Sequence, residues 1–286
     1  MSELIVTETP GVVNVVFNRP QRRNAFTTAM YAQMRDLCGQ LRGREDVRVL
    51  VLRGAGGKAF AAGNEISDFL AADAVSYEDW IRELLDMLLD LPQVTVAAVD
   101  GVCVGGGLAV ATHCDLRIAT PHSRFGYPIA KTLGNALSAP IVYRCAAAFG
   151  ESVTRQMLLT SRLVSADRAY AVGALLDVVD DLDAALDELV EGLVSVSATT
   201  QAATKRQLAL RARASETSPA GDEEMLREVY GGADFAEGVR AFLAKTPVGF
   251  PIGLGGLDGT ELVRSLGNLQ GGLPFTVLLG ADGRVL

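Results

Sequence analysis

The feature that most constrains the fold is a run of three glycines, Gly105 to Gly107, between two apolar segments. The segment before it, Val94–Val99, is short and rich in β-branched residues, which is typical of a buried strand. The segment after it begins at Leu108 and is rich in alanine, leucine and valine, which favours a buried helix. Glycine has no Cβ atom, so the backbone between the two segments can turn sharply and approach another group closely. The sequence therefore predicts a strand that passes directly into a helix.

This junction has two interpretations. The first amide groups of a helix have no partner inside it and lie at the positive end of its dipole, so they can hold an anion or a developing oxyanion. Alternatively, the glycines serve only the packing of a tight strand-to-helix turn. The residues of the junction alone leave both interpretations open.

Short apolar segments alternate with helical patterns over the first half of the chain. The predicted strands are Leu4–Thr9, Val12–Phe17, Val47–Leu52, Val94–Val99 and Leu116–Ala119, and the predicted helices run from Thr27 or Thr28 to Leu41 and from Tyr77 to Leu91. This alternation indicates an α/β fold with a mostly parallel sheet. Beyond Asn135 the pattern is almost wholly helical, over 135–149, 151–160, 165–173, 182–196, 198–213 and 222–244, with one short strand at Asp177–Val179.

Composition excludes several function classes. The chain has 286 residues and a net charge of −8, whereas nucleic-acid binding normally needs a basic face, so no nucleic-acid partner is expected. Its four cysteines form no CxxC pair, and with two histidines they offer no metal-ligand spacing, so we expect no metal and a reducing, cytoplasmic setting. The N-terminus has no secretory pattern, and the most apolar stretch contains Asp100 and four glycines, so no membrane span is expected.

Four motifs occur in a characteristic order. They are Asn18-Arg19-Pro20 followed by Arg23-Asn24-Ala25, then Phe60-Ala61-Ala62-Gly63-Asn64-Glu65-Ile66, then the triple glycine through Cys114-Asp115, and then Arg124-Phe125-Gly126-Tyr127-Pro128. Over residues 3–246 the chain resembles the crotonase family, the enoyl-CoA hydratase/isomerase superfamily. The resemblance implies a spiral of ββα turns with C-terminal trimerisation helices. It further implies a homotrimer or hexamer that acts on an acyl-CoA thioester. The corresponding domains are a core over 1–200, a helical region over 201–248 and a glycine-rich tail over 249–286.

The resemblance also implies roles for particular residues. The amide groups of Asn64 and Gly106 are the expected donors that polarise the thioester carbonyl and stabilise an enolate. Around the coenzyme A portion, the matched positions are Arg22, Arg23, Ala25, Ala62 and Ile66. Coenzyme A enters as part of the substrate, so no separate cofactor is expected.

The chain departs from the pattern at both acid/base positions. A hydratase of this family uses two glutamates, and Ala109 and Ile129 stand at the corresponding positions. Asp68 and then Glu65 are the first replacement candidates, followed by the alternatives Tyr127, Lys131, Asn135, His113 and His122, each of which also has a structural interpretation. The expected function is an acyl-CoA-processing enzyme of the hydratase/isomerase family. The alternative is an inactive acyl-CoA-binding paralogue or scaffold. A related serine hydrolase is set aside, because residues 105–112 contain no serine.

The tail differs in kind from the rest of the chain. Residues 249–286 contain ten of the thirty glycines and only one clear strand pattern, Phe275–Leu279, so a separate packed domain is not expected. Residues 251–286 resemble the late part of a TlpA-type thioredoxin-like domain. Because the chain has no CxxC, dithiol chemistry is excluded, and the tail is interpreted as a fusion remnant.

Overall fold

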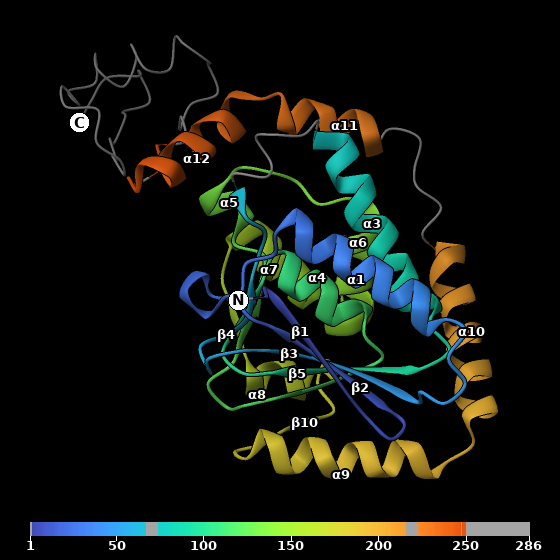
Figure 1. Ribbon diagram of the computed structural model, residues 1–286. Helices are drawn as coiled ribbons and strands as arrows, with labels where there is room; N and C mark the ends of the chain where they lie inside the picture. Colours follow the sequence, from blue (N-terminus) through green and yellow to red (C-terminus); the bar gives the residue numbers. More distant parts are fainter. Residues whose placement is uncertain (1, 67–73, 216–221, 247, 250–286) are drawn as a thin grey trace, which may run out of the picture.

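Two β-sheets form the centre of the protein. The computed structural model describes residues 2–66, 74–215, 222–246 and 248–249 (Figure 1). One sheet has six strands in the order β1 (Leu4–Thr9), β2 (Val12–Phe17), β3 (Val49–Gly54), β5 (Val94–Val99), β7 (Leu116–Ala119) and β10 (Asp177–Val178). The other has four strands in the order β4 (Ala59–Ala62), β6 (Val102–Val104), β8 (Arg124–Gly126) and β9 (Val164–Ser165). All neighbours pair in parallel except β1 with β2 and β8 with β9.

Helices cover both faces of the six-stranded sheet. The described helices are η1 (Pro20–Arg22), α1 (Thr28–Leu41), α3 (Ala74–Asp90), α4 (Gly106–His113), α5 (Ile129–Thr132), α6 (Ala139–Phe149), α7 (Glu151–Thr160), α8 (Ala166–Ala171), α9 (Leu182–Ser195), α10 (Ala198–Ser215), α11 (Asp222–Tyr230) and α12 (Ala233–Ala244). Helix α9 lies along one face, and α1, α3 and α4 lie on the other (Figure 1).

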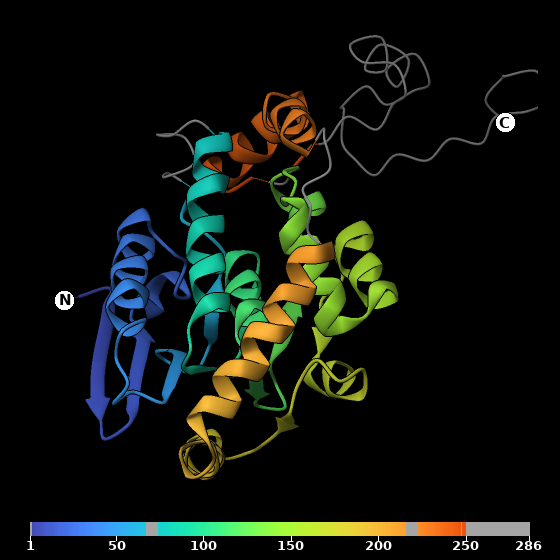
Figure 2. The ribbon, with the colours of Figure 1, turned by 90° about the vertical axis from the view of Figure 1, so that its right-hand side faces the viewer.

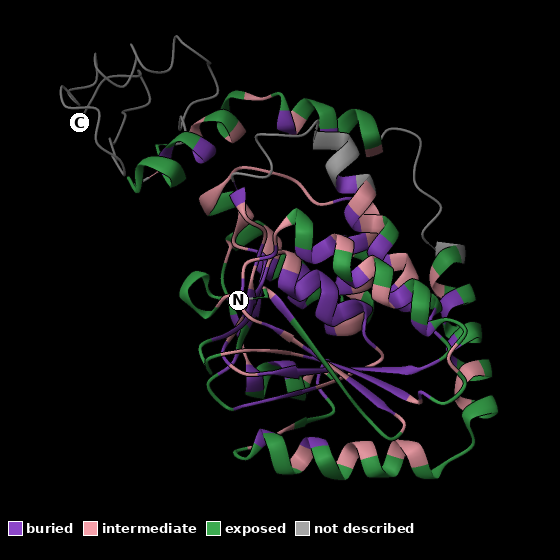
Figure 3. Cartoon of the chain, viewed as in Figure 1, coloured by how far each residue is buried: buried purple, intermediate pink, exposed green. Residues whose placement is uncertain are grey.

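Alternation along β3 shows how the sequence produces these layers. Leu50 and Leu52 belong to the large core on the α1 and α4 side, whereas Val49 and Val51 belong to the smaller core under α9. Side chains of a strand point alternately to the two faces, so a strand with both faces covered is apolar throughout. Figure 3 shows the result, with buried strands between helices whose outer faces are exposed.

Each of three consecutive strand pairs contributes one strand to each of the two sheets. In β3–β4, β5–β6 and β7–β8 the first strand joins the six-stranded sheet and the second joins the four-stranded sheet, and a helix follows each pair. This repeated ββα order confirms the predicted α/β class and agrees with the spiral expected from the resemblance. The C-terminal helices that the resemblance assigns to trimer formation are present, and their role in assembly stays a prediction.

The four-stranded sheet brings three loops to one edge. Ala62 is in register with Val104, and Val104 is in register with Gly126. These residues end β4, β6 and β8, and parallel strands present their carboxyl ends at the same edge of a sheet. The segments that follow therefore start side by side, and they carry Asn64, Gly106 and Ile129.

The structure corrects several predicted boundaries. The strand expected at Val47–Leu52 begins at Val49 and extends to Gly54, and the helix expected from residue 135 begins at Ala139, with a proline in its first turn. The helix expected over 222–244 is two helices, because Gly231 and Gly232 interrupt it and Gly232 is the N-cap of α12. Strands β4, β6 and β8 were not predicted. Asp68 and the tail from residue 250 lie outside the described residues.

The C-terminal helices pack on the core at separate places. Helix α11 lies against α3, and α12 approaches the end of α5, where a Cβ atom on Gly238 would overlap the Leu133 backbone (Figure 2). Helix α10 is fastened by the buried Lys205, whose ammonium group lies 2.6 Å from an Asp115 carboxylate oxygen and also bonds the Gln93 carbonyl. Among the described residues, no helix combines the length and apolarity that crossing a bilayer requires. The predicted boundaries at 200 and 248 stay predictions.

Candidate functional site

A cavity of about 600 Å³ opens at the common edge of β4, β6 and β8. Its lining includes every described residue predicted for the site, namely Arg22, Arg23, Ala25, Ala62, Asn64, Glu65, Ile66 and Gly106. Ala109 and Ile129 line it as well. The fold thus gathers residues that are far apart in the sequence into one cavity, and their roles in it stay predictions.

Close packing explains the glycines at the start of α4. Gly105 has φ +55°, a left-handed conformation that favours glycine. A Cβ atom on Gly106 would overlap the Asn64 side-chain oxygen and would lie 2.8 Å from the Tyr31 hydroxyl oxygen. The first turn of α4 can therefore lie directly against Asn64 only because position 106 has no side chain.

The backbone around Asn64 has a defined orientation. The Phe26 amide donates to the Gly63 carbonyl at 2.9 Å, and the Glu65 amide donates to the Phe26 carbonyl at 2.7 Å. In such a parallel bridge the intervening residue contributes neither group, so the Asn64 amide points away from Phe26. Among the described residues, neither the Asn64 amide nor the Gly106 amide has a hydrogen-bond partner. Two adjacent backbone donors are therefore available to an acceptor in the cavity.

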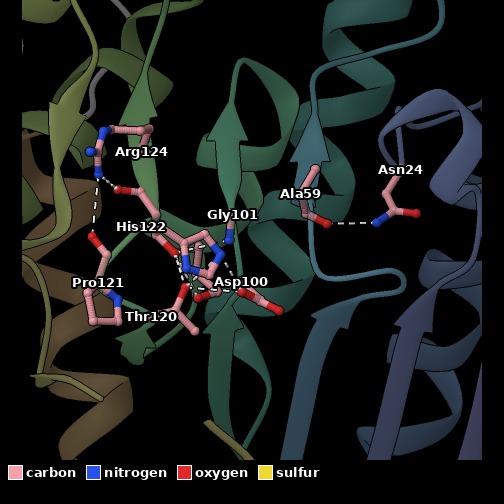
Figure 4. A network of polar contacts seen from close by, with 10 residues as sticks. Asn24, Ala59, Asp100, Gly101, Thr120, Pro121, His122 and Arg124 are labelled. Carbon is pink, nitrogen blue, oxygen red and sulfur yellow. Dashed lines mark hydrogen bonds and ion pairs between the residues drawn. The ribbon is translucent and has the colours of Figure 1, made fainter. Parts of the chain in front are cut away.

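A buried asparagine fixes the loop that carries the predicted coenzyme A residues. The Asn24 side chain donates to the carbonyls of Ala55 and Ala59, and it accepts from the Arg19 amide at 2.9 Å. Figure 4 shows its bond to Ala59. The loop also pairs with β4, since the Ala62 amide donates to the Arg23 carbonyl at 3.0 Å. Asn24 thus holds the exposed Arg22 and Arg23 at the edge of the cavity.

The candidate acid Glu65 is already engaged by a neighbouring cation. Arg19 lies 2.9 Å from its carboxylate, and the same guanidinium lies 2.9 Å from the Glu3 carboxylate. Arg19 also donates to the Ala25 carbonyl at 2.6 Å. The arrangement ties the N-terminal strand to the cavity loop, which is the structural role that the sequence left open for Glu65. The other candidate, Asp68, lies outside the described residues.

The surroundings of both histidines indicate structural roles and not catalytic ones. Burial, followed by the nearby Arg144 guanidinium, lowers the pKa of His113 to about 3, and its ring Nδ1 lies 2.7 Å from the Ala109 carbonyl oxygen. His122 is on the turn after β7, exposed, with its ring Nε2 2.9 Å from an Asp100 carboxylate oxygen (Figure 4). Neither residue lines the cavity.

The three remaining candidates for the acid or base differ in whether they line the cavity. Tyr127 is fully buried, which raises the pKa of its hydroxyl well above the ordinary value, and neither it nor Lys131 lines the cavity. Asn135 does line the cavity, and it is not a helix cap, because α6 begins later with Ser138 as its N-cap.

Sequence reasoning missed Glu78, an acidic residue that lines the cavity from α3. Its side chain is buried, with 6% exposed, and its carboxylate accepts a hydrogen bond from the Tyr230 hydroxyl at 2.7 Å. A signal for it exists in the sequence. Glu78 stands three and seven residues before Ile81 and Leu85, both buried, so it lies on the apolar side of an amphipathic helix.

Comparison with known proteins gives a consistent result. The family described as enoyl-CoA hydratase/isomerase matches residues 7–251. The chain is 27% identical to a short-chain-enoyl-CoA hydratase of Clostridium acetobutylicum, over 85% of this chain and 96% of that protein. It is 32% identical to an (E)-benzylidenesuccinyl-CoA hydratase of Thauera aromatica, over 67% and 78% respectively. A solved methylmalonyl-CoA decarboxylase in complex with 2-nitronate-propionyl-CoA is similar with a TM-score of 0.80 and 25% identity, covering 87% of this chain and 98% of that one.

Proposed function

Because the chain belongs to the enoyl-CoA hydratase/isomerase family, we propose that it binds an acyl-CoA thioester in the cavity and stabilises the enolate of that thioester. The observation that carries the proposal is the pair of available amide groups on Asn64 and Gly106. When a proton leaves the α-carbon, negative charge develops on the thioester oxygen. Donors fixed in advance around that oxygen stabilise this charge more than they stabilise the neutral carbonyl.

The placement of Gly106 adds to this stabilisation. Its amide is the first of α4, so the helix dipole gives that end partial positive charge. Each donor of such a pair contributes about 3 kcal/mol to stabilisation of the transition state in comparable enzymes. Both donors belong to the backbone, so the side chain at each position matters only for shape.

The two ends of the cavity fit the two ends of an acyl-CoA. Arg22 and Arg23 are exposed beside the loop held by Asn24, where their guanidinium groups suit the phosphates of coenzyme A. The apolar part of the lining is suited to an acyl chain and includes Ile81, Leu137 and Ile141. The ligand that we propose is therefore the whole thioester, with coenzyme A as part of the substrate and no separate cofactor.

One observation favours a second candidate function. The cavity positions that correspond to the two glutamates of a hydratase of this family are Ala109 and Ile129, and neither side chain can transfer a proton. A protein with this cavity could hold acyl-CoA without converting it. The alternative is an inactive acyl-CoA-binding paralogue.

One experiment separates the two. The protein is incubated in deuterium oxide with crotonyl-CoA and with saturated acyl-CoAs, while hydration products and deuterium at the α-carbon are measured. Uptake of deuterium supports enolate formation, and uptake without hydration favours an isomerase or another enolate reaction. Tight binding that depends on coenzyme A, with no deuterium uptake, would contradict the enzyme hypothesis and support the inactive acyl-CoA-binding paralogue. Absence of binding would refute both.

A further inference from the structure

Two acidic side chains line the cavity within the part of the chain that the structure describes, Glu65 and Glu78. Their surroundings differ. The Glu65 carboxylate is 2.9 Å from a guanidinium nitrogen of Arg19, so it is held in an ion-pair network that also includes Glu3. The Glu78 carboxylate is buried on the cavity side of α3 and accepts a hydrogen bond from the Tyr230 hydroxyl, a neutral donor. The hydroxyl of Tyr230 orients the Glu78 carboxylate in the cavity wall, and a carboxylate held at a fixed position beside a substrate is a suitable general base.

Helix α3 is fastened to the side of the cavity that carries the amide donors. The ring of Trp80 packs edge-on against the ring of Tyr31, with centroids 5.7 Å apart. The hydroxyl of Tyr31 then donates to the Asn64 side chain at 2.8 Å. One turn beyond Glu78, Ile81 also faces the cavity. The carboxylate and the two amide donors therefore belong to one packed unit around the same space.

A second set of contacts, made by Tyr230, fixes the Glu78 carboxylate. The Tyr230 hydroxyl oxygen, at the end of α11, lies 2.7 Å from Glu78 and 3.2 Å from the Ala136 carbonyl oxygen. Ala136 is in the loop before α6, next to Asn135, which lines the cavity. Tyr230 thus joins three separate segments at one point and leaves the Glu78 side chain little freedom to turn away.

We propose that Glu78 is the group that transfers the α-proton of the bound thioester, with Tyr230 as its positioning residue; this rests on the proposed function. The carboxylate takes the proton from the α-carbon, and the electron pair of that C–H bond becomes the C=C bond of the enolate. The carbonyl π pair moves to the thioester oxygen, where the Asn64 and Gly106 amides hold the charge. Return of the proton from Glu78 to the substrate carbon regenerates the carboxylate, so no co-reactant is required.

The test uses butyryl-CoA in deuterium oxide, because a saturated thioester reports proton transfer without hydration. Glu78→Gln keeps the shape and the acceptor for Tyr230 and removes the base, so α-deuterium uptake should fall by about 100-fold or more. The dissociation constant for butyryl-CoA should stay within about threefold. Glu83→Gln is the matched control on the same helix, since that carboxylate is 55% exposed and pairs with Arg35, and uptake should not change.

A separate variant tests the positioning role. Tyr230→Phe keeps the carboxylate and removes the hydroxyl, so the turnover number for exchange should fall about tenfold while the dissociation constant stays the same. A purely packing role would leave the turnover number unchanged, and that result would refute positioning. If Glu78→Gln does not fold, Glu78→Asp is used in its place. This variant keeps a carboxylate but moves it one methylene further from the substrate, so α-deuterium uptake should fall by about tenfold.

The outcomes distinguish the two proposals. Wild-type uptake that persists in Glu78→Gln overturns the role of Glu78 and leaves enolate formation intact. Binding of butyryl-CoA without uptake by the wild-type protein overturns enolate formation, and the role of Glu78 with it. Uptake that is lost in Glu78→Gln and retained in Glu83→Gln supports both.

Discussion

The contact between Gly106 and Asn64 determines how the two amide donors are spaced. A Cβ atom at position 106 would overlap the Asn64 side-chain oxygen, which is itself held by Tyr31. The first turn of α4 would have to move away from Asn64, and the two proposed donors would move apart with it. Donors at a developing oxyanion are effective only when each lies about 3 Å from it.

We expect Gly106→Ala to lower the rate of α-deuterium uptake by about 100-fold. The matched control is Gly192→Ala on α9, where nothing lies within 4 Å of the added Cβ atom and where the change should stabilise the fold by up to about 1 kcal/mol. Uptake measured with butyryl-CoA, together with urea unfolding, checks both. A Gly106→Ala protein with the wild-type rate would contradict the donor role that we propose for the Gly106 amide.

His113 gives stability a predicted pH dependence. Burial lowers its pKa to about 3 from an ordinary value of 6.5, so below pH 6.5 the unfolded chain binds a proton that the folded protein does not. The free energy of unfolding therefore falls as the pH falls from about 6.5 towards 3. Between pH 7 and pH 4.5 this residue should remove about 2–3 kcal/mol.

Urea unfolding at these two pH values measures the effect. His113→Asn should lose that part of the pH dependence, whereas His122→Asn should retain it, because His122 is exposed. Equal pH dependence in the wild type and in His113→Asn would show that the residue is not held neutral.

At the residue scale, motifs pointed to the two proposed donors and did not point to Glu78, the proposed base. Asn64 and Gly106 were predicted because they follow glycine-containing motifs that end β4 and β6. Glu78 stands outside every motif, in a helix whose direction relative to the cavity depends on the packing of α3. Its one signal was an acidic residue on an apolar helix face, and that signal does not say what the residue faces.

At the scale of elements, a largely buried ion pair fastens α10 to the core. Lys205 is 8% exposed and pairs with Asp115, whose carboxylate also accepts from the Thr95 amide and hydroxyl at 2.7 and 2.8 Å. Asp115 follows the glycine-rich helix α4, and Thr95 belongs to β5. The pair therefore joins a C-terminal helix to the central sheet and to the end of the helix that carries Gly106.

Removal of the ammonium group should leave a partly buried carboxylate without its cation. We expect Lys205→Met to lower the free energy of unfolding by about 3 kcal/mol in urea unfolding experiments. The control is Arg155→Met on α7, whose pair with Glu151 is mostly exposed and should contribute less than about 1 kcal/mol. Equal effects of the two substitutions would contradict this account of α10.

The sequence predicted strands whose apolar pattern extends over four or more residues. β1, β2, β5 and β7 have the expected bounds. In β2 and β5 the reason is a run of mostly buried residues rich in valine, which is typical of a strand covered by other elements. β6 and β8 have three residues each and are flanked by glycine or turn residues, so they show no run. Their strand character comes from pairing within the second sheet, which depends on segments distant in the sequence.

At the scale of the whole molecule, the tail can be tested as a unit. Residues 250–286, which lie outside the described part of the chain, are interpreted from the sequence as a fusion remnant. A deletion ending at Thr246 should therefore fold and should bind acyl-CoA with the affinity of the full chain. Circular dichroism and calorimetric titration against the full chain check this, and loss of either property would assign the tail a role. The trimer or hexamer implied by the resemblance stays a prediction.

The hydrogen bonds between the cavity loop and the segment that carries Asn64 have a consequence for how the protein would act on a thioester. The segment from Arg23 to Phe26 is hydrogen-bonded to the segment from Ala62 to Glu65, so Arg23 and the Asn64 amide belong to one pair of bonded segments. On the proposed function, a coenzyme A nucleotide bound beside Arg23 would hold the reacting carbonyl in place beside the Asn64 amide. Binding energy gained far from the reaction is thereby converted into alignment. A thioester stripped of its nucleotide would then react more slowly even when it saturates the protein.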